Sequence, residues 1–130
     1  MLLDASYLID LEQELAQRQF GPAVAFAGAN RTLRPRISVV TVGEMAAGAA
    51  NEAAVRRFLS RYRVVALRVE IAFLAGRLDR AMAARGARLG ENDNWIAATA
   101  LYYGEPLVTN DADFDRVAAV VGLPLKVRRY

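Results

Sequence analysis

The stretch Met1-Leu-Leu-Asp-Ala-Ser-Tyr-Leu-Ile-Asp10 decides how the rest of the chain is interpreted. Two apolar residues lead directly into Asp4, a small residue and Ser6 follow, and a helical pattern begins behind them. This order predicts a short buried strand that ends by presenting a carboxylate, with a helix after it. In open α/β sheets, ligands bind beyond the carboxyl ends of the strands. The positions of the other acidic residues therefore decide whether this edge holds a metal ion.

Short β-rich runs alternate with helical patterns along all 130 residues. The expected strands are Leu2–Leu3, Ile37–Val40, Val64–Leu67, Pro106–Thr109 and Leu125–Val127. The expected helices cover 6–17, about 22–30, 52–61, 70–88 and 94 to about 104. Such alternation predicts a mostly parallel sheet with helices on both faces. We therefore expect one α/β domain over residues 1–130, with three α/β/α layers.

The composition removes several classes of chemistry. The chain has no cysteine and no histidine, which excludes thiolate catalysis, histidine-dependent triads and most catalytic zinc sites. Its 55% apolar and 24% charged residues are typical of a globular domain. No apolar run approaches the roughly 18 residues of a membrane helix, and Asp4 and Asp10 interrupt any apolar region of a signal peptide. We expect a cytoplasmic protein without a membrane partner.

The basic residues are almost all arginine. Seventeen basic and 14 acidic residues give a net charge of +3, and the isoelectric point is about 9.7. This balance is compatible with binding to phosphate backbones, although a GC-rich genome explains the arginine count equally well. Arg31, Arg34 and Arg36 fall in a segment expected to be irregular. They are candidate RNA contacts, and a solvated loop is the simpler alternative.

Acidic residues follow apolar runs or open helices at four places. These residues are Asp4, Glu44, Asp93, and the pair Asp111 and Asp113. Each has a structural explanation on its own, because a helix N-terminus favours negative charge by about 0.3–1 kcal/mol. Thr41 and Glu44, for example, have the spacing of a capping box. Parallel strands, however, bring their C-terminal ends to one edge, where several carboxylates repel one another unless a cation lies among them.

An oxygen-only ligand set selects hard cations, so the expected cofactor is Mg²⁺ or Mn²⁺. Such ions activate water and stabilise charge during displacement at phosphorus. The residues therefore point to phosphodiester hydrolysis.

Four segments in this order resemble the PIN-domain family, and within it the VapC-like toxins of type II toxin–antitoxin modules. The segments are Leu2–Leu11, Ile37–Met45 with Gly48 after it, Glu91–Leu101 and Leu107–Phe114. Each segment is a weak signal alone, but the four together cover essentially the whole chain. The resemblance implies a Mg²⁺- or Mn²⁺-dependent endoribonuclease, usually a homodimer, that a cognate antitoxin holds inactive.

The resemblance also assigns roles to residues of this chain. The catalytic and metal-binding residues would be Asp4, Glu44, Asp93 and Asp111, with Asp113 a second-rank ligand and with Ser6 and Thr109 in support. Whether Asp111 or Asp113 faces the metal stays open, because relatives differ in this spacing. Leu8, Leu11, Leu15 and Phe26 would form either a groove for an antitoxin helix or ordinary core.

Three other functions fit these residues less well. A non-catalytic PIN module that binds RNA or a protein partner is the main alternative, although the chain retains all the acidic residues. A haloacid-dehalogenase-like phosphatase needs a second aspartate two residues after the nucleophile, and this chain has Ser6 there. A dinucleotide-binding fold lacks its Gly-x-Gly-x-x-Gly motif.

Overall fold

Five short parallel strands form the centre of the molecule. The computed structural model describes residues 1–120 and 122–130. The strands are β1 (Leu2–Leu3), β2 (Arg36–Ser38), β3 (Arg63–Val65), β4 (Leu107–Val108) and β5 (Val127–Arg128). Their order in the sheet is β3-β2-β1-β4-β5, and all four pairings are parallel. The chain therefore moves from β1 outward through β2 to β3 and then crosses to the other side of β1.

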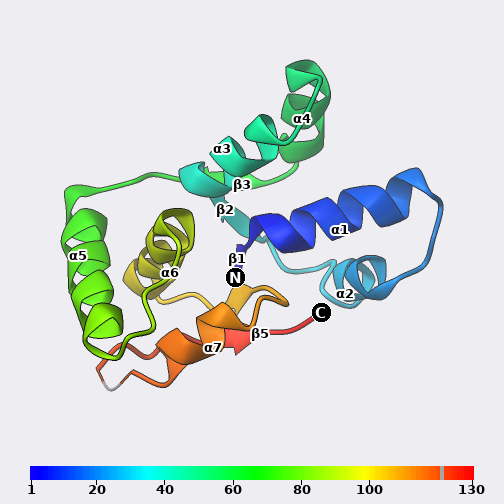
Figure 1. Cartoon of the computed structure of the whole chain (residues 1–130). Helices are drawn as coiled ribbons and strands as arrows, with labels where there is room; N and C mark the ends of the chain where they lie inside the picture. Colours follow the sequence, from blue (N-terminus) through cyan, green and yellow to red (C-terminus); the bar gives the residue numbers. More distant parts are fainter. Residues whose placement is uncertain (121) are drawn as a thin grey trace.

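Helices cover both faces of this sheet. They are α1 (Ala5–Ala16), α2 (Pro22–Ala29), α3 (Val39–Ala47), α4 (Glu52–Leu59), α5 (Val69–Ala84), α6 (Glu91–Tyr103) and α7 (Asp113–Ala118). Figure 1 shows α5 and α6 together on one side, with α1 and α2 on the opposite side. The expected three-layer α/β architecture is confirmed. None of the helices among the described residues is both long and apolar enough to cross a membrane.

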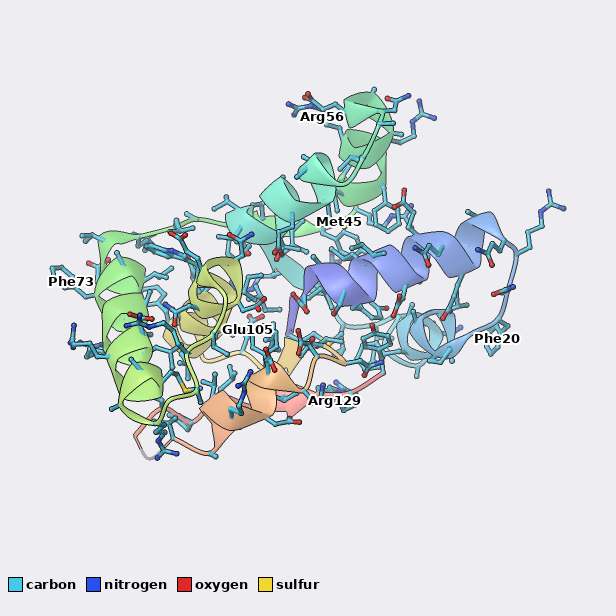
Figure 2. The ribbon with its side chains drawn as sticks, viewed as in Figure 1. Phe20, Met45, Arg56, Phe73, Glu105 and Arg129 are labelled. Atoms are coloured by element: carbon cyan, nitrogen blue, oxygen red, sulfur yellow. The ribbon has the colours of Figure 1, made fainter. Side chains whose placement is uncertain are left out.

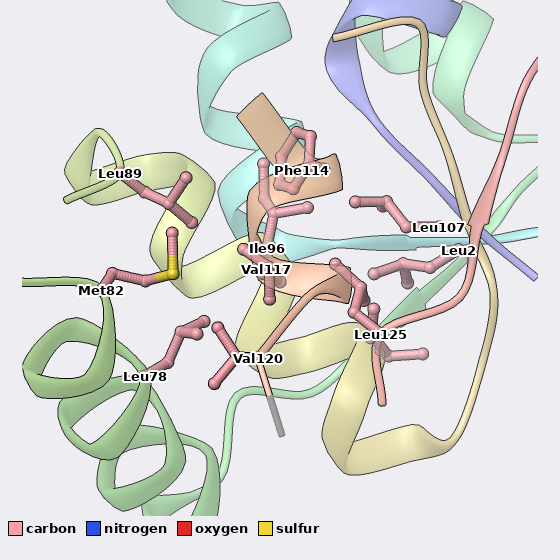
Figure 3. Close-up of a cluster of buried hydrophobic side chains, with 13 residues drawn as sticks. Leu2, Leu78, Met82, Leu89, Ile96, Leu107, Phe114, Val117, Val120 and Leu125 are labelled. Carbon is pink, nitrogen blue, oxygen red and sulfur yellow. The ribbon is translucent and has the colours of Figure 1, made fainter. Parts of the chain in front are cut away.

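The two residues of β1 pack into two different hydrophobic clusters, one on each face of the sheet. Leu2 packs with residues of α5, α6 and α7, as Figure 3 shows, whereas Leu3 packs with residues of α1 to α4. Successive side chains of a strand point to opposite faces of the sheet. Because both residues are essentially inaccessible to solvent, β1 is fixed from both faces. Asp4, the next residue, is consequently held at a defined place on the C-terminal edge.

The second strand ends earlier than expected, and this changes the role of Glu44. We expected a strand to Val40 with Thr41 as the cap of the next helix. Instead, β2 ends at Ser38, whose hydroxyl oxygen accepts a hydrogen bond from the Thr41 amide at 2.9 Å and so caps α3. The predicted capping box is therefore wrong. Glu44 lies in the second turn of α3, too far along the helix to bond its first amides.

Other boundaries differ from the expectations by a few residues. Helix α6 begins at Glu91, so Asp93 lies inside its first turn and does not precede it. Strand β5 begins at Val127, which is the residue in register with Leu107 of β4. The amides of Leu107 and Thr109 donate to the carbonyls of Lys126 and Arg128 on either side of it. The short helix α7, which contains Asp113, was not expected. The start of β5 is thus set by its pairing with β4.

A compact ionic cluster ties the N-terminal edge of the sheet together. Glu105, just before β4, accepts a hydrogen bond from Arg36 at the start of β2 and pairs with the Met1 ammonium at 2.9 Å. Burial by itself raises the pKa of Glu105, but the hydrogen bonds from Arg36 and the N-terminus outweigh it and leave the pKa below its usual value. The cluster therefore stabilises the fold when Glu105 is ionised.

Replacing Glu105 with Gln is expected to lower the free energy of unfolding near pH 7 by about 1–3 kcal/mol, because charged hydrogen-bond partners are lost. A carboxyl whose folded-state pKa is depressed contributes stability above its unfolded pKa, and this stability is lost as the pH falls through the folded value. The difference between wild type and variant should thus shrink on acidification below the ordinary pKa of 4.5. Urea denaturation across this pH range measures it; an equal difference at pH 7 and pH 3 would contradict the electrostatic explanation.

Candidate functional site

The carboxylate of Asp4 is the most firmly held group at the C-terminal edge of the sheet. It is 5% exposed and caps α1, with Oδ1 accepting a hydrogen bond from the Ala5 amide at 2.8 Å. Its Oδ2 accepts hydrogen bonds from the hydroxyls of Ser6 at 2.7 Å and Thr109 at 2.8 Å. Three donors therefore fix both oxygens. The structure brings Ser6 and Thr109 to Asp4, where the sequence analysis expected them.

Thr109 also connects Asp4 to the loop after β4. The Thr109 side chain is fully buried, and its oxygen accepts a hydrogen bond from the Asp111 amide at 3.0 Å. The Asp111 carboxylate accepts one from the Asp113 amide at 2.8 Å. The Asp113 carboxylate pairs with Arg116 of α7 at 2.5 Å. Asp113 thus already has a cationic partner, whereas no ion pair engages Asp111 among the described residues.

Glu44 enters the same edge from α3 and is held from α6. The side-chain amide of Asn92 donates a hydrogen bond to Glu44 Oε1 at 3.1 Å. Burial raises the pKa of Glu44, the Asn92 hydrogen bond lowers it, and the Asp4 charge raises it further. The sequence analysis missed Asn92. Its only signal was its place between two acidic residues at a helix start, which is also an ordinary capping sequence.

The pKa of Asp93 depends on the other four carboxylates of this edge. Burial, followed by the charges of Asp4, Asp111, Glu44 and Asp113, raises the pKa of Asp93 from 3.8 to about 6. For their charges to act on Asp93, all four acids must lie within electrostatic range of it. The structure therefore brings the five predicted acidic residues to one edge, which we call the carboxylate edge.

The donor set of the carboxylate edge suits a hard divalent cation. All five side chains offer oxygen, and neutralisation would relieve the repulsion that raises the pKa of Asp93. In the described part of the chain, no three of these carboxylates are close enough to enclose a metal ion as they stand. Asp4 is fixed, so binding would require the less buried side chains of Glu44, Asp93 and Asp111 to turn toward it.

The arginines predicted to contact RNA lie elsewhere. Arg31, Arg34 and Arg36 border one hollow at the N-terminal edge of the sheet, opposite the carboxylate edge. We expected Arg36 in an irregular loop, but it is the first residue of β2. Its guanidinium group pairs with Glu105 and lies 5.0 Å from the ring centre of Tyr103. The structure therefore does not bring these arginines to the carboxylates.

Arg129 and Tyr130, which follow β5, contact the loop after β4 and helices α7 and α1. Arg129, labelled in Figure 2, donates hydrogen bonds to the carbonyls of Thr109 at 2.9 Å and Asp111 at 3.0 Å. It also pairs with Asp115 at 2.6 Å. The Tyr130 hydroxyl donates to Asp10 at 2.7 Å. Sequence reasoning missed Arg129, because nothing in the local sequence indicates that the residue after β5 reaches the loop after β4.

Comparison with known proteins shows which fold the chain shares with them. A family model described as PIN domain matches residues 1–120. In structure, the chain is similar to VapBC2 from Rickettsia felis, solved with a promoter DNA fragment, with a TM-score of 0.80, 19% identity, and coverage of 99% of this chain and 97% of that chain. It is similar to VapBC-1 from nontypeable Haemophilus influenzae, with a TM-score of 0.77, 23% identity, and coverage of 98% and 96%.

A third similar structure is VapBC-5 from Mycobacterium tuberculosis, a member of the VapBC family of toxin–antitoxin systems. Its TM-score is 0.71 and its identity 22%, with 99% of this chain and 97% of that chain covered. At these identities the three similarities establish a shared fold. No curated protein matches the chain in a sequence comparison.

Proposed function

The chain belongs to the PIN-domain family, and from that membership we propose that it is a metal-dependent endoribonuclease and the toxin of a type II toxin–antitoxin module. The observation that carries the proposal is the carboxylate edge, where burial and the charges of four neighbouring acidic residues raise the pKa of Asp93 to about 6. Charge repulsion of this kind destabilises the folded protein unless a cation neutralises it. A divalent cation that binds a phosphodiester would do so.

We assign the metal-holding role to Asp4, Glu44, Asp93 and Asp111. Asp4 is the fixed anchor, because its oxygens are already oriented by Ala5, Ser6 and Thr109. Asp111 is preferred over Asp113 because Arg116 pairs with Asp113. Asp113 would then support the site indirectly, because its backbone amide donates a hydrogen bond to the Asp111 carboxylate and fixes its position.

When bound, Mg²⁺ or Mn²⁺ would supply the Lewis acidity that activates water and stabilises negative charge on the phosphodiester. The residues of this chain would orient that chemistry. Asn92 would hold Glu44 beside Asp93, and Thr109 would hold Asp4 beside Asp111. No histidine is available, so proton transfer would depend on these carboxylates and on solvent.

Metal removal is the direct test of this function. We expect cleavage of a mixed pool of structured and single-stranded RNA with Mg²⁺ or Mn²⁺, and none with EDTA. We also expect added Mg²⁺ to raise the melting temperature, because a ligand that binds only the folded state stabilises it. Cleavage that persists in EDTA would contradict the proposal. A protein that neither cleaves RNA nor gains stability from metal would instead support the non-catalytic PIN module.

An apolar groove offers a surface for the proposed antitoxin. It has a volume of about 440 Å³ and is lined in part by Leu11, Leu15 and Phe26. Leu8, which we had grouped with these residues, is fully buried core, whereas Leu15 is 47% exposed. An amphipathic helix docks into a groove of this kind through its apolar face.

The proposed homodimer has a candidate face on α5. Val69 and Phe73, one helical turn apart, are 65% and 68% exposed, and Figure 2 shows Phe73 pointing away from the rest of the chain. Large exposed apolar residues at this spacing are typical of a helix that packs against another chain.

A further inference from the structure

The N-terminal edge of the sheet carries a second charged feature, opposite in sign to the carboxylate edge. A hollow of about 990 Å³ opens there, bordered by Arg31, Arg34, Arg36, Arg61 and Arg63. We call it the arginine hollow. Among the described residues, no acidic side chain borders it, although acidic residues are nearly as numerous as basic ones in the chain.

The fold itself forces these arginines together. Arg36 and Arg63 are the first residues of β2 and β3, and the parallel register pairs them directly. Neighbouring strands are about 4.8 Å apart, so the two cations repel one another. Arg61 precedes β3, and Arg31 and Arg34 lie in the connection before β2. The Met1 ammonium is close by, and Glu105 is the acid that faces both it and Arg36.

Two of the five arginines already have structural contacts. Arg36 pairs with Glu105, and Arg61 packs over the Phe58 ring, with its guanidinium carbon 5.0 Å from the ring centre. Arg31, Arg34 and Arg63 are exposed and have no ion-pair partner among the described residues. Three side chains at the hollow are therefore available to an anion that approaches from solvent.

We infer that the arginine hollow is a second RNA-binding site, which holds the phosphate backbone of a segment that is not being cleaved. The inference rests on the proposed function for the identity of the substrate. Guanidinium groups pair with phosphate oxygens in a bidentate manner. None of the described residues that border the hollow has an aromatic ring on which a base could stack, so recognition would involve the backbone and tolerate any sequence.

The position of the hollow explains why a separate site is useful. Five carboxylates repel an RNA strand from the edge at which cleavage is proposed. Strands β2 and β3 have three residues each, so at about 3.3 Å per residue the two edges are only about 10 Å apart along the strands. Since β3 is an edge strand of the sheet, a strand of RNA passing it reaches both edges with a few additional nucleotides.

Binding measured without cleavage separates this inference from the nuclease proposal. The probe is a labelled 20-nucleotide oligouridylate, titrated in EDTA at several salt concentrations and followed by fluorescence anisotropy. The test protein carries Arg31→Gln, Arg34→Gln and Arg63→Gln. The matched control carries Arg57→Gln, Arg77→Gln and Arg80→Gln, which remove the same charge from exposed helix positions. Both proteins keep the Arg36–Glu105 pair, and thermal melting verifies their folding.

We expect the test protein to bind oligouridylate at least 10-fold more weakly than wild type, and the control less than threefold more weakly. Loss of three phosphate contacts should lower the slope of log affinity against log salt by about 2. An oligothymidylate should lose affinity in parallel, because the backbone phosphates are shared. Equal losses in test and control proteins would overturn the inference. The inference would also be overturned if the test protein still bound oligouridylate but no longer bound polyglutamate. That result would assign the hollow to an acidic peptide.

Discussion

Replacing Asp93 with Asn is expected to lower the rate of RNA cleavage at least 100-fold and, at the same time, to stabilise the metal-free protein. The first effect follows from the proposed role in metal binding, since even groups that only support metal ligands contribute about 10–100-fold. The second follows from the pKa of Asp93, which burial and neighbouring acids raise to about 6. Opposite signs for activity and stability would distinguish a functional carboxylate from a structural one.

The sign of the stability effect can be stated explicitly. A carboxyl whose pKa is higher in the folded state than in the unfolded state opposes folding once it is ionised. The difference between wild type and variant should therefore be absent below the unfolded value of 3.8, grow between there and the folded value of about 6, and be full at pH 7. Thermal melting in EDTA across this range measures it. Added Mg²⁺ should reverse the order by stabilising the wild type alone.

Asp79→Asn is the matched control for this experiment. Asp79 is a half-exposed residue of α5 that pairs with Arg88 at 3.0 Å, and its charge is not among those that raise the pKa of Asp93. Its substitution should leave RNA cleavage unchanged and should not raise the melting temperature. If Asp93→Asn cleaves RNA at the wild-type rate, the assignment of Asp93 is wrong.

Thr109→Val should produce the second largest effect, through the position of Asp4. Valine has nearly the shape of threonine but lacks the hydroxyl that donates to Asp4 Oδ2 and accepts from the Asp111 amide. The buried Asp4 carboxylate and the partly buried Asp111 amide each lose a partner, which costs about 1–3 kcal/mol of unfolding free energy. Loss of orientation at a metal ligand should also weaken Mg²⁺ affinity or cleavage by about 10–100-fold.

Thr99→Val separates these two consequences. Thr99 is as buried as Thr109, but its hydroxyl donates within α6 to the Trp95 carbonyl at 2.7 Å. Its substitution should reduce stability without affecting Mg²⁺-induced stabilisation. Thr109→Ser should restore most of the metal affinity, because the hydroxyl returns. If Thr109→Val and Thr99→Val show the same Mg²⁺ response, Thr109 supports the fold and does not orient Asp4.

The sequence predicted the parts of this molecule that depend on local patterns. The alternation of apolar runs and helices was sufficient for the α/β class, and the acids that follow those runs were sufficient for the carboxylate edge. The end of a strand was predicted poorly where more than one residue could cap the next helix. Strand β2, for example, ends at Ser38 because that hydroxyl caps α3, although Thr41 has the same capping chemistry.

The least predictable features depend on contacts between remote segments. Asn92 reaches Glu44 across 48 residues, and Arg129 reaches Thr109 across 20. Arg31 and Arg34 were predicted as RNA contacts from their own segment, but their place opposite the carboxylates depends on which end of each strand they adjoin. Only the strand order and register determine that placement.

The hydrogen bond between Asp4 and Thr109 has a consequence for the order of events during synthesis. The two residues are separated by 105 positions, so a ribosome adding about 5–20 residues per second requires roughly 5–20 s between them. Until then, β1 lacks its neighbour β4 and Asp4 lacks a donor that orients it. A nascent chain therefore cannot assemble the carboxylate edge until Thr109 has been synthesised, and the destructive activity we propose would begin only after that point.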